Sequence, residues 1–231
     1  MLFLIIAAIS AALIHTVLGP DHYLPFIVLS RAWKWSRAKT VVITILCGIG
    51  HVGSSVILAL IGVAIGKEVF RIQAIEKFRS EIAAWLLLGF GFAYLVWGIF
   101  HAIKNTPHEH VHLHSDGEAH AHPHNHHNEH AHPHNADFNA APWLLFIIFI
   151  FGPCEPMIPI VMYPAAKGNI TEAILVSLAF SVVTILTMTT IVVISTFGLV
   201  KIDLKKFERF SHAAAGLVIL AAGIGIKFLG L

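Results

Sequence analysis

The stretch HTVLGPDHYLP, residues 15–25, places two histidines and an aspartate inside an N-terminal segment that is otherwise almost entirely apolar. Ionisable side chains deep in a bilayer cost about 3 kcal/mol each on insertion scales, so they usually face a cavity and mark a substrate or proton path. Gly19-Pro20 predicts a helix break, because proline lacks an amide hydrogen and glycine tolerates bent backbone. We therefore expect a broken membrane helix that carries a polar site.

Composition identifies the chain as an integral membrane protein. Of its 231 residues, 57% are hydrophobic and 12% charged, and the mean hydropathy of +0.78 lies far above that of soluble domains. Continuous apolar runs favour helices over a barrel, and a helix crosses a hydrocarbon core of about 30 Å with about 20 residues. The sequence predicts an all-α protein with six spans, over residues 2–30, 40–66, 81–103, 141–165, 170–200 and 213–231.

A second Gly-Pro stretch predicts an internal repeat. GPCEPMIPIVMYPAAK begins at Gly152 and resembles GPDHYLPFIVLSRAWK, which begins at Gly19; likewise GLVILAAGI from Gly216 resembles GFAYLVWGI from Gly91. Three spans per half is an odd number, so the second half must cross the membrane in the opposite sense. We expect two inverted three-helix repeats, residues 1–103 and 141–231, with spans 1 and 4 broken at Gly-Pro. Transporters of this design hold their substrate at the breaks.

The linker between the halves, residues 104–140, is rich in histidine. Twelve histidines fall within residues 108–134, and HAHPHN occurs twice. A segment with so few apolar residues is expected to be disordered. Imidazole is a good ligand for nickel, cobalt, zinc and copper, and a flexible chain can supply several at once. We predict metal binding by the loop, through His120, His122, His124, His130, His132 and His134. A solvated spacer without a metal role is the alternative.

Lys and Arg in the connecting segments give the orientation. Nine lie on the side of the His-rich loop and five on the opposite side, and cytoplasmic loops carry the excess. This favours an outside N-terminus and a cytoplasmic loop. The apolar start has no basic region before it, so we expect a retained first span rather than a signal peptide.

Together, the predicted spans contain imidazole, carboxylate and thiol side chains that could bind a divalent 3d metal ion. Residues 15 and 22 are two helical turns apart, and Cys47, His51 and Ser54 share one side of span 2. Nitrogen and oxygen donors replace the hydration shell of such an ion, and carboxylates offset its charge. The predicted intramembrane ligands are His15, Asp21, His22, His51, Cys154 and Glu155.

These residues resemble the motifs of two related groups. The nickel/cobalt permeases, with the UreH-like and NicO proteins, have a span motif of His, four residues and Asp-His, followed by Gly-His-Ser-Thr. His15, Asp21 and His22 look like the first motif with five intervening residues, and Gly50-His51 looks like the start of the second. The efflux branch typically has six spans and a cytoplasmic His-rich loop between spans 3 and 4. The resemblance implies metal transport across a bacterial or archaeal cytoplasmic membrane.

A second resemblance, to the CcdA/DsbD thiol-redox carriers of the same superfamily, rests on FGPCEPMIPI. Those carriers place one cysteine in each half at matching positions, whereas the position that matches Cys154 here is Asp21. The other thiol, Cys47, lies in span 2. A dithiol relay would require the two Cα atoms to lie roughly 4.4 to 6.8 Å apart.

The leading hypothesis is a secondary transporter of a divalent metal, nickel or cobalt first and zinc or iron next, with export favoured. No catalytic residue, tightly bound cofactor or nucleic-acid partner is expected. The expected partners are the lipid bilayer and metal ions, with a homo-oligomer and a metallochaperone left open. The alternatives are a thiol-disulfide electron carrier, an accessory protein that holds metal for an enzyme, and an exporter of small solutes such as sulfur oxyanions. Metal identity, direction and coupling ion stay open.

Overall fold

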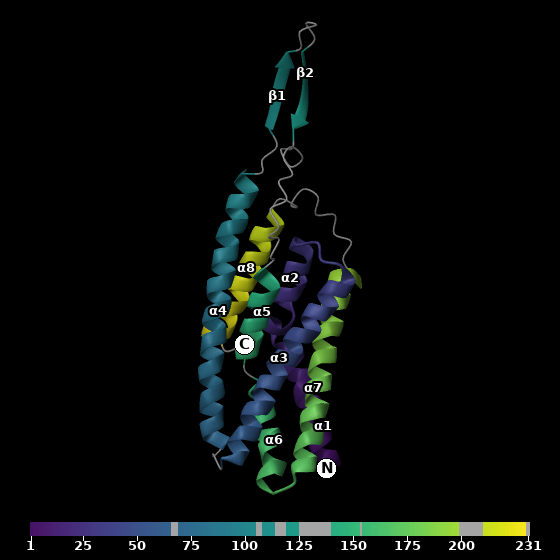
Figure 1. Cartoon of the computed structure of the whole chain (residues 1–231), viewed down its shortest axis with the longest axis vertical. Coiled ribbons are helices and arrows are strands. Elements are labelled where there is room, and N and C mark those ends of the chain that lie inside the picture. The colour runs from purple at the N-terminus through teal and green to yellow at the C-terminus, as the bar shows by residue number, and fades with distance from the viewer. Residues whose placement is uncertain are drawn as a thin grey trace.

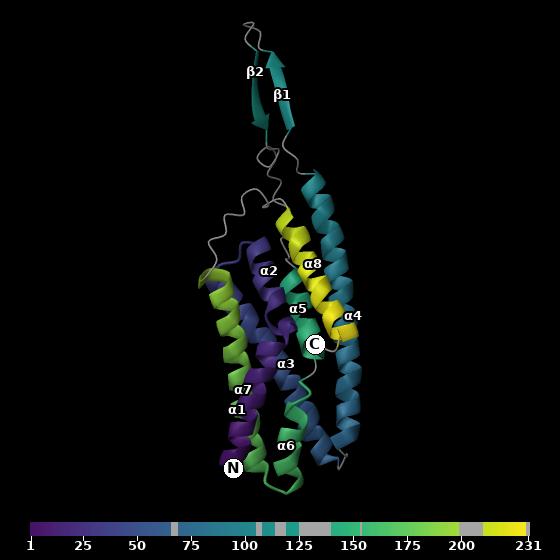
Figure 2. The same cartoon turned by 180° about the vertical axis from the view of Figure 1, so that it is seen from behind.

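The computed structural model describes residues 1–65, 69–104, 108–113, 119–124, 140–152, 154–198 and 210–229. Its helices form an elongated bundle (Figures 1 and 2). They are α1 (Leu2–Leu18), α2 (Leu24–Ala32), α3 (Arg37–Ala64), α4 (Val69–Lys104), α5 (Ala140–Phe151), α6 (Met157–Ala166), α7 (Ile170–Val193) and α8 (Ser211–Ile224). A 3-10 turn (Pro20–His22) joins α1 to α2, and π-helical turns extend α7 over Ile194–Gly198 and α8 over Gly225–Leu229.

The α-helical membrane architecture is confirmed. Among the described residues, four helices are long and apolar enough to cross a membrane, or up to five spans if a bent pair is one span. The bent pair is α1 with the segment Pro20–Ala32, which meet at 82°. α5 and α6 are shorter apolar helices. The total of six spans and the inverted repeat stay predictions.

Both expected breaks fall at the Gly-Pro positions. α1 ends at Leu18, and Gly19 leaves the helix with φ −88° and ψ 95°. α5 ends at Phe151 and α6 begins at Met157, while Pro153 lies outside the described residues. Proline cannot donate the backbone hydrogen bond that would continue either helix, which accounts for both interruptions.

The two breaks lie inside the bundle because long helices pack around them. α3 packs against α5, α6 and α7, α1 packs along α7, and α4 packs along α8 (Figure 1). Two apolar cores result, one that includes Phe26, Leu145 and Ile219, and one that includes Ile158 and Phe180.

Glycines let α4 and α8 approach at backbone distance. A Cβ on Gly91 would lie 2.5 Å from the backbone N of Leu220, and a Cβ on Gly216 would lie 2.3 Å from the backbone N of Leu95. Small residues at helix contacts are the usual means of close packing in membranes, where dispersion contacts rather than water exclusion hold helices together. Any larger side chain at either glycine would push the two helices apart.

α4 is longer than the sequence predicted. The expected third span began at residue 81, because the charges at Arg71, Glu76, Lys77 and Arg79 favoured a loop. The helix instead starts at Val69, and Glu76 is completely buried within the bundle. The charges are tolerated because Glu76 and Arg79, one turn apart, pair with each other.

Part of the His-rich linker is paired rather than disordered. β1 (His108–Leu113) and β2 (Ala119–His124) form an antiparallel hairpin in which His108, His110 and His112 are opposite His124, His122 and His120. The two segments alternate in sequence with a period of two, which suits strands. A two-stranded hairpin is marginally stable alone. His130, His132 and His134, predicted as ligands, lie outside the described residues.

Candidate metal centre

The break in the first helix brings His22 beneath His15. His15 is in the last turn of α1, and its carbonyl accepts the N–H of Gly19. The 3-10 turn then bends the chain by 82°, so that the two rings lie edge to face with centroids 4.7 Å apart. Glycine is required at residue 19, because a Cβ there would lie 2.5 Å from Nδ1 of His22.

α3 supplies the third imidazole. His51 is 2% exposed, and its ring centroid lies 5.0 Å from that of His22. The second helix break covers its other side: a Cβ on Gly152 would lie 2.9 Å from Nδ1 of His51. His51 therefore lies between the two breaks that the sequence predicted.

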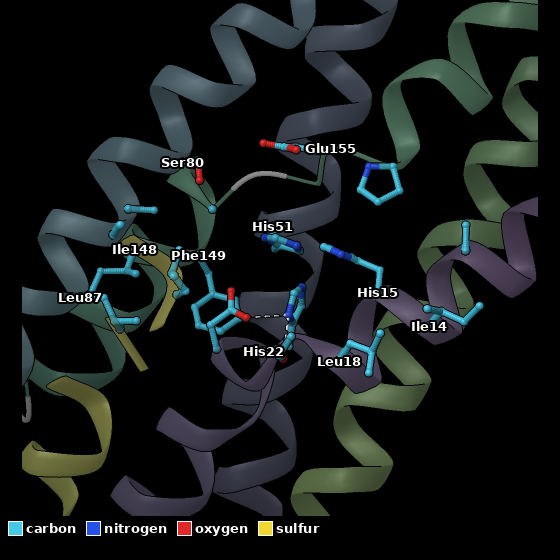
Figure 3. A pocket seen from close by; sticks show the side chains of 18 residues that line it. Ile14, His15, Leu18, His22, His51, Ser80, Leu87, Ile148, Phe149 and Glu155 are labelled. Atoms are coloured by element: carbon cyan, nitrogen blue, oxygen red, sulfur yellow. Dashed lines mark hydrogen bonds and ion pairs between the residues drawn. The ribbon is translucent and has the colours of Figure 1, made fainter. Parts of the chain in front are cut away.

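His15, His22 and His51 form a cluster whose ligand atoms all lie within 4.8 Å of one another. Figure 3 shows the three rings turned toward a common point. Within the described part of the chain, Nε2 of His15, Nε2 of His22 and both ring nitrogens of His51 are buried without a hydrogen-bond partner. Buried polar atoms without partners are rare and costly. Three imidazoles arranged in this way can hold one transition-metal ion, which would satisfy them together.

Asp21 fixes the tautomer of His22. Nδ1 of His22 lies 3.1 Å from Oδ1 of Asp21 and 3.1 Å from the carbonyl oxygen of Gly19. Both partners are acceptors, so Nδ1 must carry the hydrogen and Nε2 keeps its lone pair free. A carboxylate that orients a ligating imidazole is common around metal sites. Asp21, predicted as a ligand, is here a partner of His22.

The cluster opens into a pocket of about 770 Å³ between the broken helices and α4. Carboxylates of Asp21 and Glu155 line it together with the three histidines. In Figure 3, Glu155 lies near Ser80 of α4, on the far side of His51 from His22. The pocket is large enough for a hydrated ion, and its two carboxylates would attract a cation.

The cysteines lie apart from this cluster. Cys47 and Cys154 are both buried and unpaired. Cys47 belongs to the core that includes Leu145 and Cys154 to the core that includes Ile158. Of the six predicted intramembrane ligands, the described part of the structure gathers His15, His22 and His51 as one cluster.

Two polar residues next to the site escaped the sequence analysis. Glu76 and Arg79 of α4 form an ion pair, with Nη1 of Arg79 2.6 Å from Oε1 of Glu76. Arg79 also donates to the hydroxyl of Ser54 and to the carbonyl of Ile150. The signal that could have identified them is the i, i+3 spacing of opposite charges within IQAIEKFRSEIA, residues 72–83, where Ile72 and Ala83 continue an apolar face.

Comparison with known proteins places the chain at family level. No curated protein and no solved structure matches it significantly. The family of the cytochrome c biogenesis protein transmembrane region matches residues 26–225, which include His51 and Cys154. The resemblance to nickel/cobalt permeases stays a prediction. Because the match covers most of the sequence, the chain belongs to the family of the cytochrome c biogenesis protein transmembrane region.

Proposed function

We propose that the protein is a secondary transporter of a divalent transition-metal ion, nickel or cobalt first. The observation that supports this most is the cluster of His15, His22 and His51, in which four buried ring nitrogens have no hydrogen-bond partner among the described residues. In the proposed cycle, an ion enters the pocket past the carboxylates of Asp21 and Glu155, exchanges water for imidazole nitrogen, and leaves on the opposite side. Three neutral ligands hold a 3d ion less tightly than thiolates would, which suits a site that must also release it.

The proposed transport mechanism uses two inverted repeats. Gly91 of α4 meets Leu220 of α8, and Gly216 of α8 meets Leu95 of α4. Gly91 and Gly216 are the residues that begin the two similar stretches of sequence, so equivalent positions exchange contacts. Such reciprocity is expected of halves related by a two-fold axis, and it supports alternating access by movement of one half against the other.

We place the His-rich loop in the cytoplasm of a bacterial or archaeal cell, where it gathers metal before export. The excess of Lys and Arg on the loop side supports this orientation. Binding by several histidines raises the local metal concentration near the pocket without a dedicated cofactor. The membrane, the direction of flux and the loop side all belong to the proposal.

The direct test is metal flux in proteoliposomes that contain the purified full-length protein. A metal-sensitive dye inside the vesicles would report entry of nickel, cobalt, zinc and iron in separate runs. We expect saturable flux of nickel or cobalt that exceeds flux through protein-free vesicles. Equal flux in both kinds of vesicle for all four metals would rule out the proposed transport.

A thiol-disulfide carrier is the second candidate, and the family match favours it over metal transport. In that reading, Cys154, which follows Gly152-Pro153, would exchange disulfides with a thioredoxin-like partner. The positions of the two thiols support it less, because Cys47 and Cys154 lie in different cores. The geometry of the histidines therefore outweighs it in our proposal.

Replacing both cysteines separates the two candidates. We expect the Cys47→Ser, Cys154→Ser variant to keep metal flux within about twofold of the wild type, because neither thiol belongs to the histidine cluster. Serine is close in size to cysteine, but its hydroxyl is costly in an apolar core, so thermal unfolding of the variant is measured alongside flux. A mixed disulfide trapped between Cys154 and a thioredoxin-like protein, together with loss of function in the double variant, would favour the carrier instead.

Asp21→Asn tests the proposed support of His22. The amide can donate to Nδ1 and so stabilise the wrong tautomer, and it lacks the negative charge that strengthens the ligand. Loss of such a supporting carboxylate costs about 10- to 100-fold in metal affinity. We expect the half-saturating nickel concentration to rise about tenfold or more with the maximal flux nearly retained, and an unchanged concentration would remove Asp21 from the site.

A further inference from the structure

The second helix break leaves backbone groups without their usual partners. In a continuous α-helix the carbonyl of residue i accepts the N–H of residue i+4. Ile150 would accept from Cys154, but α5 ends at Phe151. Beyond the break, the Cys154 carbonyl accepts the N–H of Met157, three residues on, as α6 begins. A backbone carbonyl without a hydrogen-bond donor costs free energy inside a membrane. Another donor must therefore replace the N–H that the Ile150 carbonyl has lost.

Arg79 supplies the replacement. Its Nη2 donates to the Ile150 carbonyl and, at 2.6 Å, to Oγ of Ser54. Its Nη1 donates to Oε1 of Glu76 at 2.6 Å and reaches Oγ of Ser55 at 3.4 Å. Glu76 is completely buried, and its Oε2 has no hydrogen-bond partner among the described residues, so Arg79 is the group that its carboxylate contacts. The ion pair therefore brings a donor to the Ile150 carbonyl, which the break deprives of its usual partner.

The same contacts converge on His51. Ser54, which Arg79 contacts, donates its hydroxyl to the carbonyl of His51 at 2.8 Å. Gly152, two residues beyond Ile150, packs against the His51 ring. Arg79 thus joins the backbone of the helix that carries His51 to the backbone that covers its ring.

At the first break, too, a side chain donates to a backbone carbonyl that the break leaves without its usual partner. The carbonyl of Val17, three residues before Pro20, accepts the hydroxyl of Tyr23 at 3.2 Å. Ile150 is likewise three residues before Pro153. The first break is therefore held from within its own segment, whereas the second depends on a charge from α4.

We propose that Glu76 and Arg79 are positioning residues: their ion pair replaces the hydrogen bond lost at the second break and thereby fixes His51 in the histidine cluster. Buried ion pairs often add little net stability compared with apolar side chains of similar size. A role in fixing geometry accounts for such a costly pair in a membrane segment better than a role in stability does.

The test replaces the pair as a unit, because removal of one partner would leave a lone buried charge that can prevent folding. Glu76→Leu with Arg79→Met keeps similar volume without charge. The first readout is alkylation of Cys154 by a membrane-permeant maleimide in a Cys47→Ser background, which needs no metal. We expect the labelling rate of Cys154, fully buried in the intact protein, to rise at least fivefold because the break loosens.

The second readout rests on the proposed function. We expect the half-saturating nickel concentration for flux to rise about 10- to 100-fold, the range found for groups that orient metal ligands. Arg79→Lys keeps the positive charge but loses the forked guanidinium donors. It should also raise the half-saturating nickel concentration, by a smaller factor. Thermal unfolding of each variant reports whether the fold is kept.

A second ion pair of α4 provides the matched control. Glu81 pairs with Lys227 beside the pocket, and Glu81 is 46% exposed. Glu81→Gln with Lys227→Gln should leave both readouts within twofold of the wild type. Unchanged labelling of Cys154 in the folded Glu76→Leu, Arg79→Met variant would overturn the positioning role. Absence of nickel flux in the wild type would overturn the proposed function alone, because the labelling experiment would still decide the role of the pair.

Discussion

His22→Ala is expected to abolish metal transport while the protein still folds. His22 is the central member of the cluster, with its ring 4.7 Å from that of His15 and 5.0 Å from that of His51. Its loss leaves two imidazoles that no longer share a neighbour. Loss of a group that merely supports a ligand costs up to about 100-fold in affinity, so loss of the ligand itself should cost at least that much. Nickel flux at subsaturating concentration should fall about 100-fold or more.

The matched control is a histidine outside the cluster. His101 lies near the end of α4, where its ring stacks on Trp97 at 5.1 Å. His101→Gln should leave flux within twofold of the wild type. Size-exclusion profiles and thermal unfolding would confirm that both variants are folded. Full nickel flux in folded His22→Ala protein would exclude the histidine cluster as the transport site.

The helix breaks were predictable because their cause is local. Proline at residues 20 and 153 removes a donor whatever surrounds it, and the adjacent glycines permit the turn. The approach of His15 to His22 followed from the same stretch of sequence. Its geometry did not follow, because the 82° bend depends on how α2 packs against α8.

The role of Glu76 and Arg79 was not predictable, because it depends on contacts distant in sequence. Arg79 donates to Ile150, 71 residues away. From sequence alone, four charges within nine residues favoured a solvated loop, whereas the helix turns two of them inward to pair. Cys154 was predicted as a ligand because it follows Gly152-Pro153 at the second break; its side chain is buried in an apolar core, and its role as a ligand stays a prediction.

The family match and the histidine cluster describe different parts of the chain. The match begins at residue 26 and therefore covers His51 but not His15 or His22. The transmembrane framework thus carries the family relationship, while α1 and the 3-10 turn that follows it add the two imidazoles that complete the cluster. A bundle with a helix break inside the membrane can carry either a reactive thiol or a metal ligand. Both kinds of site use a side chain placed where a helix is interrupted.

Gly216→Val is expected to disrupt the bundle itself. The new Cβ would lie 2.3 Å from the backbone N of Leu95 and 2.5 Å from its Cα. Backbone cannot rotate away as a flexible side chain can, so α8 must move from α4. Overpacking against side chains costs typically about 1–3 kcal/mol, and overpacking against backbone should reach at least the upper value. We expect loss of the monodisperse folded peak after extraction in mild detergent.

Reciprocal variants would then test whether the two halves are equivalent. Gly91→Val makes the same contact from the other helix, with its Cβ 2.5 Å from the backbone N of Leu220. If a two-fold axis relates α4 to α8, both variants should be equally damaging. At Gly89 on the same helix, no described atom outside the adjacent turns of that helix lies within 4 Å of the added Cβ, so Gly89→Val should fold normally. Normal folding of both Gly216→Val and Gly91→Val would contradict the close contact of α4 and α8, whereas damage from only one would argue against symmetric packing of the two repeats.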